Sequence, residues 1–230
     1  MSYKLIDKAS LFIFDWDGVI IDSKQACFLT LKKTLENRID LTWEKFCDYN
    51  NSHKDFFSEL SLGNKEKLEF DLSFRENCKK DAKFINGSIE AIKELRGLGK
   101  KVAIATNCTH SSIIDMTRHF DVFNLFDIVI GKSLRSSEPT SDVSCTRQGL
   151  SAKGLALKPK PYPDMIEYII KKLEIKSKNT VMVGDSKTDI IAGKKAKTKT
   201  VGVLSGYTDG IELKHEKPDF IFDNIFNMIK

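Results

Sequence analysis

The sequence has no uninterrupted apolar run near the roughly 18–20 residues that a helix needs to cross a bilayer. The opening residues, MSYKLIDKASLFIFDWDG, carry acids where a secretory leader would carry small residues. We therefore expect a cytoplasmic protein that has no signal peptide and no membrane partner. We expect it to be a monomer or a homodimer.

The sequence has few cysteines, and their number and spacing do not suggest pairs. The 230 residues contain five cysteines, an odd number, and no Cys-x-x-Cys pair. This pattern argues against a disulfide framework and against a zinc site, and it predicts reduced, mostly buried thiols.

A strong charge of one sign is also missing. Lysine and arginine total 37 against 32 aspartates and glutamates, a formal net charge of +5. Nucleic-acid binders usually concentrate a larger basic excess on one face. We therefore expect no nucleic-acid partner, and a small anionic substrate is enough to account for the mild excess.

Several motifs of common enzyme classes are absent. The chain has neither a GxGxxG nor an HExxH pattern. Gly131-Lys132-Ser133 resembles the end of a P-loop, but the first glycine of that motif would fall at Phe126. Asp15-x-Asp17 resembles the start of an EF-hand loop but lacks the glycine and glutamate that such a loop requires.

What the sequence does contain is an alternation of short apolar runs and amphipathic segments. Strands alternating with helices of this length predict βαβ units, and hence an α/β fold with a Rossmann-like parallel sheet. The expected strands are 10–14, 102–106, 127–131, 180–184, 200–204 and 219–222. The expected helices between them are 88–96, 111–119, 164–173 and 189–196.

Residues 22–86 differ from the rest because they are helical throughout, with Thr42 and Asn64 as expected N-caps. We therefore predict a small helical domain at 22–86, inserted after the first strand. The α/β core would comprise 1–21 and 87–230.

Polar groups follow the expected strands at the edge where ligands bind in open parallel sheets. These groups are Asp15, Asp17, Thr106, Asn107, Lys160, Asp185 and Asp189. Converging carboxylates repel one another unless a cation joins them, and hard oxygen ligands favour Mg²⁺. A hydroxyl, an amide and an ammonium beside that cation would bind a phosphoryl group. Each residue alone has an ordinary explanation, such as a helix N-cap or a surface lysine, so the prediction depends on the combination.

These residues lie in motifs that resemble those of the haloacid dehalogenase-like hydrolases with a helical cap. The motifs are DWDGVIIDS (15–23), ATN (105–107), KPYPD (160–164), VGDSKTDIIAG (183–193) and TVGVLSGY (200–207). Within that superfamily, the α/β part is most similar to phosphoglycolate-phosphatase-like enzymes.

The resemblance implies a role for each residue. Asp15 would be the nucleophile that accepts the phosphoryl group, and Asp17 the general acid and base. Thr106 and Asn107 would bind the substrate phosphate. Lys160 would steady both the phosphate and the nucleophile.

The resemblance also implies a Mg²⁺ site. A side-chain oxygen of Asp15, the backbone carbonyl of Asp17 and the carboxylate of Asp185 would hold the ion. Asp189 would either support these ligands or be an additional acidic ligand itself.

The implied function is Mg²⁺-dependent hydrolysis of a small phosphorylated metabolite through an aspartyl phosphate, as in a phosphoglycolate phosphatase. A phosphosugar mutase of the β-phosphoglucomutase type is an alternative, although Cys27 stands where such enzymes have a histidine. A dehalogenase would lack the second aspartate, which is present here as Asp17. A non-catalytic binding protein with this fold is the remaining alternative.

The connection at 133–158 is longer than the family pattern. It has a loop-like composition with four basic and two acidic residues. It is either a flap that modulates access of an anionic substrate or a tolerated surface insertion.

Overall fold

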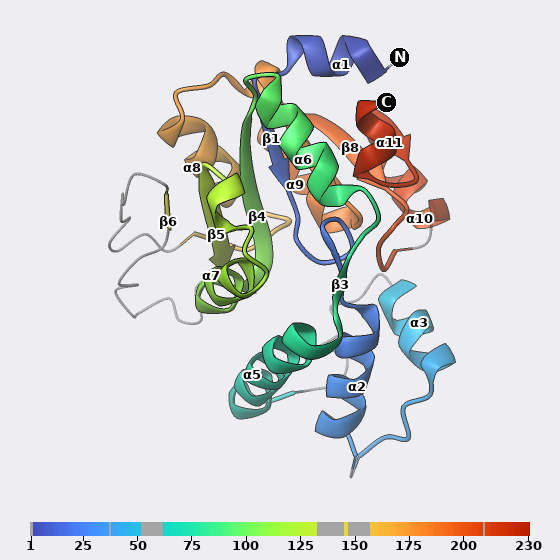
Figure 1. The fold of residues 1–230 in the computed structure, drawn as a ribbon. Coiled ribbons are helices and arrows are strands. Elements are labelled where there is room, and N and C mark those ends of the chain that lie inside the picture. The colour runs from blue at the N-terminus through green and yellow to red at the C-terminus, as the bar shows by residue number, and fades with distance from the viewer. Residues whose placement is uncertain (1, 37, 52–61, 133–144, 147–156, 209) are drawn as a thin grey trace.

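A computed structural model gives the fold of the protein (Figure 1). It describes residues 2–36, 38–51, 62–132, 145–146, 157–208 and 210–230. The connection at 133–158, for which a flap and a surface insertion are both open, lies mostly outside the described residues. Among the described residues, no helix is both long enough and apolar enough to cross a membrane.

The core is a seven-stranded sheet with strand order β6-β5-β4-β1-β7-β8-β9. Six of the strands run parallel, and β6 pairs antiparallel with β5 at the edge. The strands are β1 (Leu11–Phe14), β4 (Lys101–Thr109), β5 (Ile128–Lys132), β6 (Cys145–Thr146), β7 (Thr180–Gly184), β8 (Lys199–Val203) and β9 (Phe220–Phe222). The predicted parallel α/β core is confirmed.

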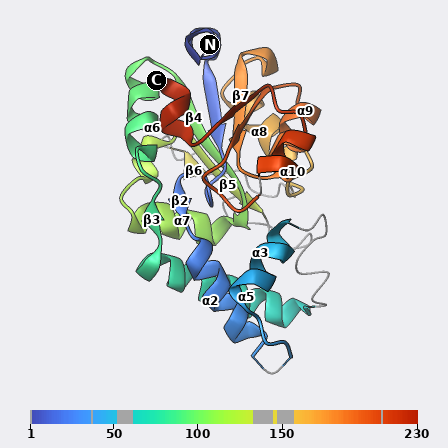
Figure 2. The same ribbon diagram turned by 90° about the vertical axis from the view of Figure 1, so that its right-hand side faces the viewer.

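Helices cover both faces of this sheet, as Figure 2 shows in a view along it. Alternate side chains of β1 point to opposite faces: Phe12 and Phe14 join one buried cluster, while Leu11 and Ile13 join the other. Both faces of the sheet are therefore buried, which explains why its strands are continuous apolar runs in the sequence. The helices of the core are α1 (Ser2–Lys8), α6 (Ser88–Gly97), α7 (His110–His119), α8 (Asp164–Lys172), α9 (Lys187–Lys195), α10 (Gly210–His215) and α11 (Ile225–Ile229).

A helical cap is inserted after β1 and lies beyond one end of the sheet (Figure 1). Its described helices are α2 (Lys24–Thr34), α3 (Trp43–Asn51) and α5 (Asn64–Asp81). The chain enters and leaves the cap through two short antiparallel strands, β2 (Ile21–Asp22) and β3 (Lys83–Phe84). This two-stranded sheet is the neck between the core and the cap.

One of the two N-cap predictions is wrong. Thr42 precedes α3, and its Oγ1 accepts a hydrogen bond from the Lys45 backbone N–H at 3.3 Å, as predicted. Asn64 instead begins α5, and Gly63 is the N-cap residue. The backbone N–H of Gly63 donates to Glu66 Oε2 at 2.7 Å, so the glutamate three residues on satisfies this helix end.

Candidate active site

The first strand delivers Asp15 to the edge of the sheet that faces the cap. Beyond β1 the backbone N–H of Asp15 still donates to the Val183 carbonyl of β7 at 2.9 Å. The next N–H, of Trp16, donates to Asp15 Oδ1 at 2.8 Å. The Trp16 side chain itself is fully buried in the core. Backbone pairing on one side and a core anchor on the other therefore fix the Asp15 carboxylate, which is 13% exposed.

A buried lysine joins two of the predicted carboxylates. The Lys160 ammonium lies 2.9 Å from Asp15 Oδ1 and 2.5 Å from Asp189 Oδ1, and its side chain is 1% exposed. Burial alone would lower the pKa of Lys160, but the two carboxylates outweigh it and raise this pKa above its usual range. Lys160 is therefore a permanently charged partner of Asp15.

Three carboxylates form a cluster with the chemistry of a cation site. Oxygens of Asp15, Asp185 and Asp189 all lie within 4.8 Å of one another. Both oxygens of Asp189 are already engaged, one by Lys160 and the other by the N–H and hydroxyl of Ser186 at 3.1 and 2.6 Å. Asp189 is thus placed to support the cluster.

Two oxygens of this cluster are available to a cation. Asp185 Oδ2 accepts the Tyr207 backbone N–H at 2.7 Å, whereas Oδ1 of Asp185 and Oδ2 of Asp15 accept no hydrogen bond from any described residue. Hard carboxylate oxygens with room for water are the donor set that Mg²⁺ prefers, so these residues fit that ion.

Without a cation, the cluster holds its protons tightly. Burial, with the neighbouring carboxylates adding to it, raises the pKa of Asp15 to about 7 against the attraction of Lys160. Burial likewise raises the pKa of Asp185 well above its ordinary value, and Asp189 and Asp15 add to the shift. Both raised pKa values mean that the carboxyl groups of the cluster lose their protons readily only when further positive charge binds beside them.

Glycine allows the loops to close over Asp185. A Cβ atom at Gly206 would overlap the Asp185 carboxylate, and one at Gly18 would lie 2.5 Å from Asp185 Oδ2. Gly18 also has a φ of +74°, a conformation that side chains disfavour. Any larger residue at either position would displace the carboxylate.

Asp17 occupies a separate polar cage beside this cluster. The Ser23 hydroxyl donates to its Oδ1 at 2.6 Å, and the Cys108 thiol donates to its Oδ2 at 2.9 Å. The Tyr207 hydroxyl lies 2.7 Å from Ser23 Oγ and extends the chain of hydrogen bonds. Burial raises the pKa of Asp17, although the bonds from Cys108 and Ser23 oppose the shift. A carboxyl group with a raised pKa suits proton donation near neutral pH.

Sequence reasoning missed the three residues of this cage. Ser23 and Tyr207 each close a quoted motif, and Cys108 directly follows another. Their places beside these motifs were the one indication in the sequence that they belong to the site. Their residue types alone are as typical of helix capping or core packing.

The predicted phosphate-binding pair lies at the end of β4. Thr106 is buried, and its Oγ1 accepts the Cys108 backbone N–H at 3.2 Å. The Asn107 amide forms two bonds with the backbone of Lys160: Nδ2 donates to the Lys160 carbonyl at 3.0 Å, and Oδ1 accepts the Lys160 N–H at 2.9 Å. Asn107 therefore holds Lys160 in place, and binding of phosphate by this pair stays a prediction.

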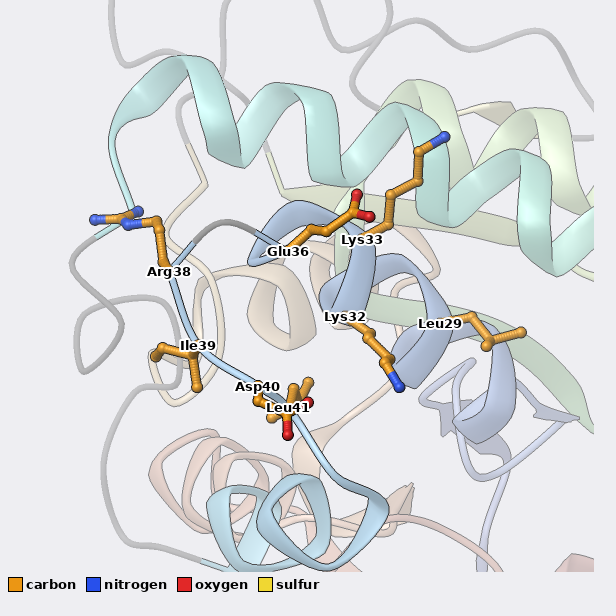
Figure 3. A pocket seen from close by; sticks show the side chains of 8 residues that line it. All are labelled: Leu29, Lys32, Lys33, Glu36, Arg38, Ile39, Asp40 and Leu41. Carbon is orange, nitrogen blue, oxygen red and sulfur yellow. The ribbon is translucent and has the colours of Figure 1, made fainter.

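A pocket of about 700 Å³ is formed by residues of the cap (Figure 3). Its lining residues are Leu29, Lys32, Lys33, Glu36, Arg38, Ile39, Asp40 and Leu41. None of them belongs to the catalytic set that the sequence predicts, and most are exposed. The candidate chemistry is therefore at the edge of the sheet and not in this pocket.

Comparison with known proteins finds relatives that match along nearly the whole chain. A phosphoglycolate phosphatase from Colwellia psychrerythraea is 23% identical over 240 residues, with 97% of each chain covered. Pyrophosphatase PpaX from Bacillus mycoides is 22% identical, with 96% of each covered. The crystal structure of a predicted phosphoglycolate phosphatase from Haemophilus somnus superposes with a TM-score of 0.71 at 21% identity, covering 96% of this chain and 97% of that one.

The family model for haloacid dehalogenase-like hydrolases matches residues 9–197. This range contains every site residue that the sequence predicts. The chain belongs to the haloacid dehalogenase-like hydrolases.

Proposed function

We propose that the protein is a Mg²⁺-dependent phosphatase that hydrolyses a small phosphorylated metabolite through an aspartyl phosphate at Asp15. The observation that carries this proposal is the buried Lys160 ammonium, 2.9 Å from Asp15, beside a cluster of carboxylates that needs a cation. This arrangement gives a nucleophile and the positive charge that a phosphoryl group requires.

In the proposed reaction, Thr106 and Lys160 hold the phosphoryl group against Asp15. The Asp15 carboxylate attacks phosphorus, the ester P–O bond breaks, and Asp17 donates its proton to the leaving oxygen. Asp17 then takes a proton from water as that water attacks phosphorus. The P–O bond to Asp15 breaks, and inorganic phosphate leaves.

Asp15 and Asp185 would hold the Mg²⁺ ion with the Asp17 carbonyl, and Asp189 would orient Lys160. When bound, the ion supplies positive charge that offsets the carboxylates and the phosphate. Relatives named as a phosphoglycolate phosphatase and a pyrophosphatase support a small phosphate ester or anhydride as the substrate class.

The side chain of Cys27 favours hydrolysis over a mutase reaction. Burial raises the pKa of the Cys27 thiol, with the negative charge of Asp17 adding to the shift. A thiol held in its protonated form cannot take the part of a general base.

We also propose that the cap domain comprises residues 22–86 and the core 1–21 and 87–230. The neck of β2 and β3 supports this division because it joins the two parts at Ile21–Asp22 and Lys83–Phe84.

A screen of phosphorylated metabolites, with and without Mg²⁺, tests the proposed function. We expect release of inorganic phosphate from at least one small ester, and loss of that release when a chelator removes the metal. Hydrolysis that a chelator leaves unchanged would contradict the proposal.

A further inference from the structure

We propose that Cys108 is a positioning residue for the reaction: its thiol holds the Asp17 carboxylate in the orientation that protonates the leaving group. This inference rests on the proposed function, in which Asp17 is the acid. It concerns a residue that the reaction scheme above does not use.

The geometry places the thiol directly on the carboxylate. Cys108 Sγ lies 2.9 Å from Asp17 Oδ2, and the hydroxyl of Ser23 takes the other oxygen at 2.6 Å. A carboxylate held by one donor can still rotate about its Cβ–Cγ bond. Two donors, one on each oxygen and from distant parts of the chain, fix its plane.

The backbone around Cys108 is built to hold it there. The register between β4 and β5 shifts between Thr106 and Thr109, so Cys108 lies within an irregular segment of the strand. A Cβ atom at Gly131 of β5 would lie 2.6 Å from the Cys108 carbonyl oxygen. Only a glycine there lets the two strands approach this closely, and the approach restrains Cys108.

Cys108 also connects two functions of the site. Its backbone N–H donates to Oγ1 of Thr106, the predicted phosphate-binding hydroxyl, at 3.2 Å. Its side chain contacts Asp17. One residue thus sets the position of the acid relative to the residue expected to bind the phosphate.

This role predicts a defect that depends on the leaving group. An alkoxide leaving group needs a proton from Asp17, whereas a p-nitrophenolate group leaves without one. Asp17 also acts as the base in hydrolysis of the aspartyl phosphate, a step that both esters share, whereas kcat/KM reports only the steps up to phosphoryl transfer to Asp15. A misplaced acid therefore lowers kcat/KM for the alkyl ester and spares kcat/KM for the aryl ester. A residue that only fills space would affect both esters alike.

The experiment compares kcat/KM for p-nitrophenyl phosphate with kcat/KM for the best alkyl phosphate from the screen, in the Mg²⁺-loaded protein. Cys108→Ala removes the donor, Cys108→Val removes it while filling the volume, and Cys108→Ser restores a donor. Cys47→Ala on α3 is the matched control, because Cys47 is also half-buried and its position lies in the cap.

We expect Cys108→Ala and Cys108→Val to lower kcat/KM for the alkyl ester by about tenfold or more, and to leave kcat/KM for the aryl ester within about twofold. Cys108→Ser should regain much of the loss, and Cys47→Ala should match the wild type. If the Ala and Val variants keep the wild-type ratio of the two kcat/KM values, the inference is wrong while the proposed function stands. If the wild type hydrolyses neither ester, the proposed function fails first.

Discussion

Lys160 shows how one side chain can serve both stability and chemistry. Its ammonium is almost fully enclosed and lies between the carboxylates of Asp15 and Asp189. Removing one partner of a buried ion pair strongly lowers the free energy of unfolding, because the remaining charge stays buried without a counter-charge. The lysine that would bind a phosphoryl group is therefore also the residue that keeps these acids together.

Lys160→Met should accordingly destabilise the protein by roughly 3–5 kcal/mol, since it leaves Asp15 and Asp189 without their buried counter-charge. Urea unfolding of the metal-free protein measures this change in the free energy of unfolding. Lys93→Met, at an exposed position of α6, is the control and should stay within about 0.5 kcal/mol of the wild type. Equal effects of the two substitutions would contradict this account of Lys160.

Among the elements, α5 of the cap and α7 of the core meet along a polar seam. Asp71 Oδ2 accepts the hydroxyls of Thr109 and Ser112 at 2.8 and 2.9 Å. Further along, the Lys79 ammonium lies 2.6 Å from Asp115 Oδ2. Because α7 begins just after the predicted phosphate-binding pair, this seam ties the cap to the loop that would bind the substrate phosphate.

Asp71→Ala removes the acceptor for two hydroxyl groups, those of Thr109 and Ser112, and both of these residues are buried at the start of α7. We expect a loss of about 1–3 kcal/mol in the free energy of unfolding. Glu69→Ala on the same helix is the matched control, because the exposed pair of Glu69 with Lys65 at 3.8 Å contributes at most about 1 kcal/mol. Denaturant unfolding compares the two, and a loss for Asp71→Ala no larger than that for Glu69→Ala would show that the seam is unimportant.

Strands β8 and β9 are linked by a carboxylate whose charge stabilises the fold. Burial opposes ionisation of Asp219, but bonds from the Lys199 ammonium and from the Thr200 N–H and hydroxyl outweigh it and lower the pKa of Asp219. The folded state thus favours the charged form, so the stabilisation is present above the unfolded pKa and is lost as the pH falls through the lower folded value.

Asp219→Asn should therefore destabilise the protein near neutral pH and lose its effect under acid conditions. The difference in the free energy of unfolding between variant and wild type should shrink as the pH falls below about 4. Guanidinium unfolding at a series of pH values measures it. A difference that is the same at every pH would mean that the charge of Asp219 does not contribute.

The same elements show what the sequence could predict. The run TVMVG identified β7 at its observed limits, because a strand buried on both faces is apolar without interruption. The two-residue strands β2 and β3 were not predicted, since two residues carry no periodicity. Asn64 has a residue type that favours the N-cap position, but in the structure the helix begins at Asn64 and Gly63 is the N-cap residue.

The site also contains residues that the sequence could predict and residues that it could not. Asp15, Thr106 and Asp185 could be predicted because each directly follows, or lies near the end of, a recognisable strand. Ser23 and Cys108 could not, because their function arises from contacts with Asp17 that the tertiary fold creates. Cys108 lies 91 positions from Asp17, and no local pattern encodes such a pairing.

At the scale of the whole molecule, the sheet order explains why distant residues converge. Strand β1 lies at the centre, between β4 and β7, so their carboxyl ends lie side by side. Asp15, Thr106 and Asp185 therefore lie at the same edge of the sheet. The inserted cap lies beyond one end of the sheet (Figure 1). The cost is a cluster of buried acids, which makes the stability of the metal-free protein depend on pH.

In the metal-free protein, the folded state binds the Asp15 proton more tightly than the unfolded chain does, because its pKa is about 7 and not 3.8. Stability should therefore fall as the pH rises from about 4 to about 7. Mg²⁺ would offset this loss, so the rise in Tm that Mg²⁺ produces should be larger at about pH 8 than at about pH 5.

Differential scanning calorimetry with and without Mg²⁺ measures this rise in Tm. Asp185→Ala, which removes an expected ligand, should abolish most of it. A rise that is independent of pH, or one that Asp185→Ala leaves intact, would argue against a cation at this cluster.

The most direct test of the account is to trap the phosphoryl group on the protein. Borohydride reduces an aspartyl phosphate to homoserine, and mass spectrometry of the digested protein then identifies the converted position. During turnover of a phosphate ester with Mg²⁺, we expect conversion at Asp15 and nowhere else. The Asp15→Asn variant should show no conversion and should lose activity by at least about a thousandfold. Conversion at another residue, or near wild-type hydrolysis by Asp15→Asn, would contradict the account.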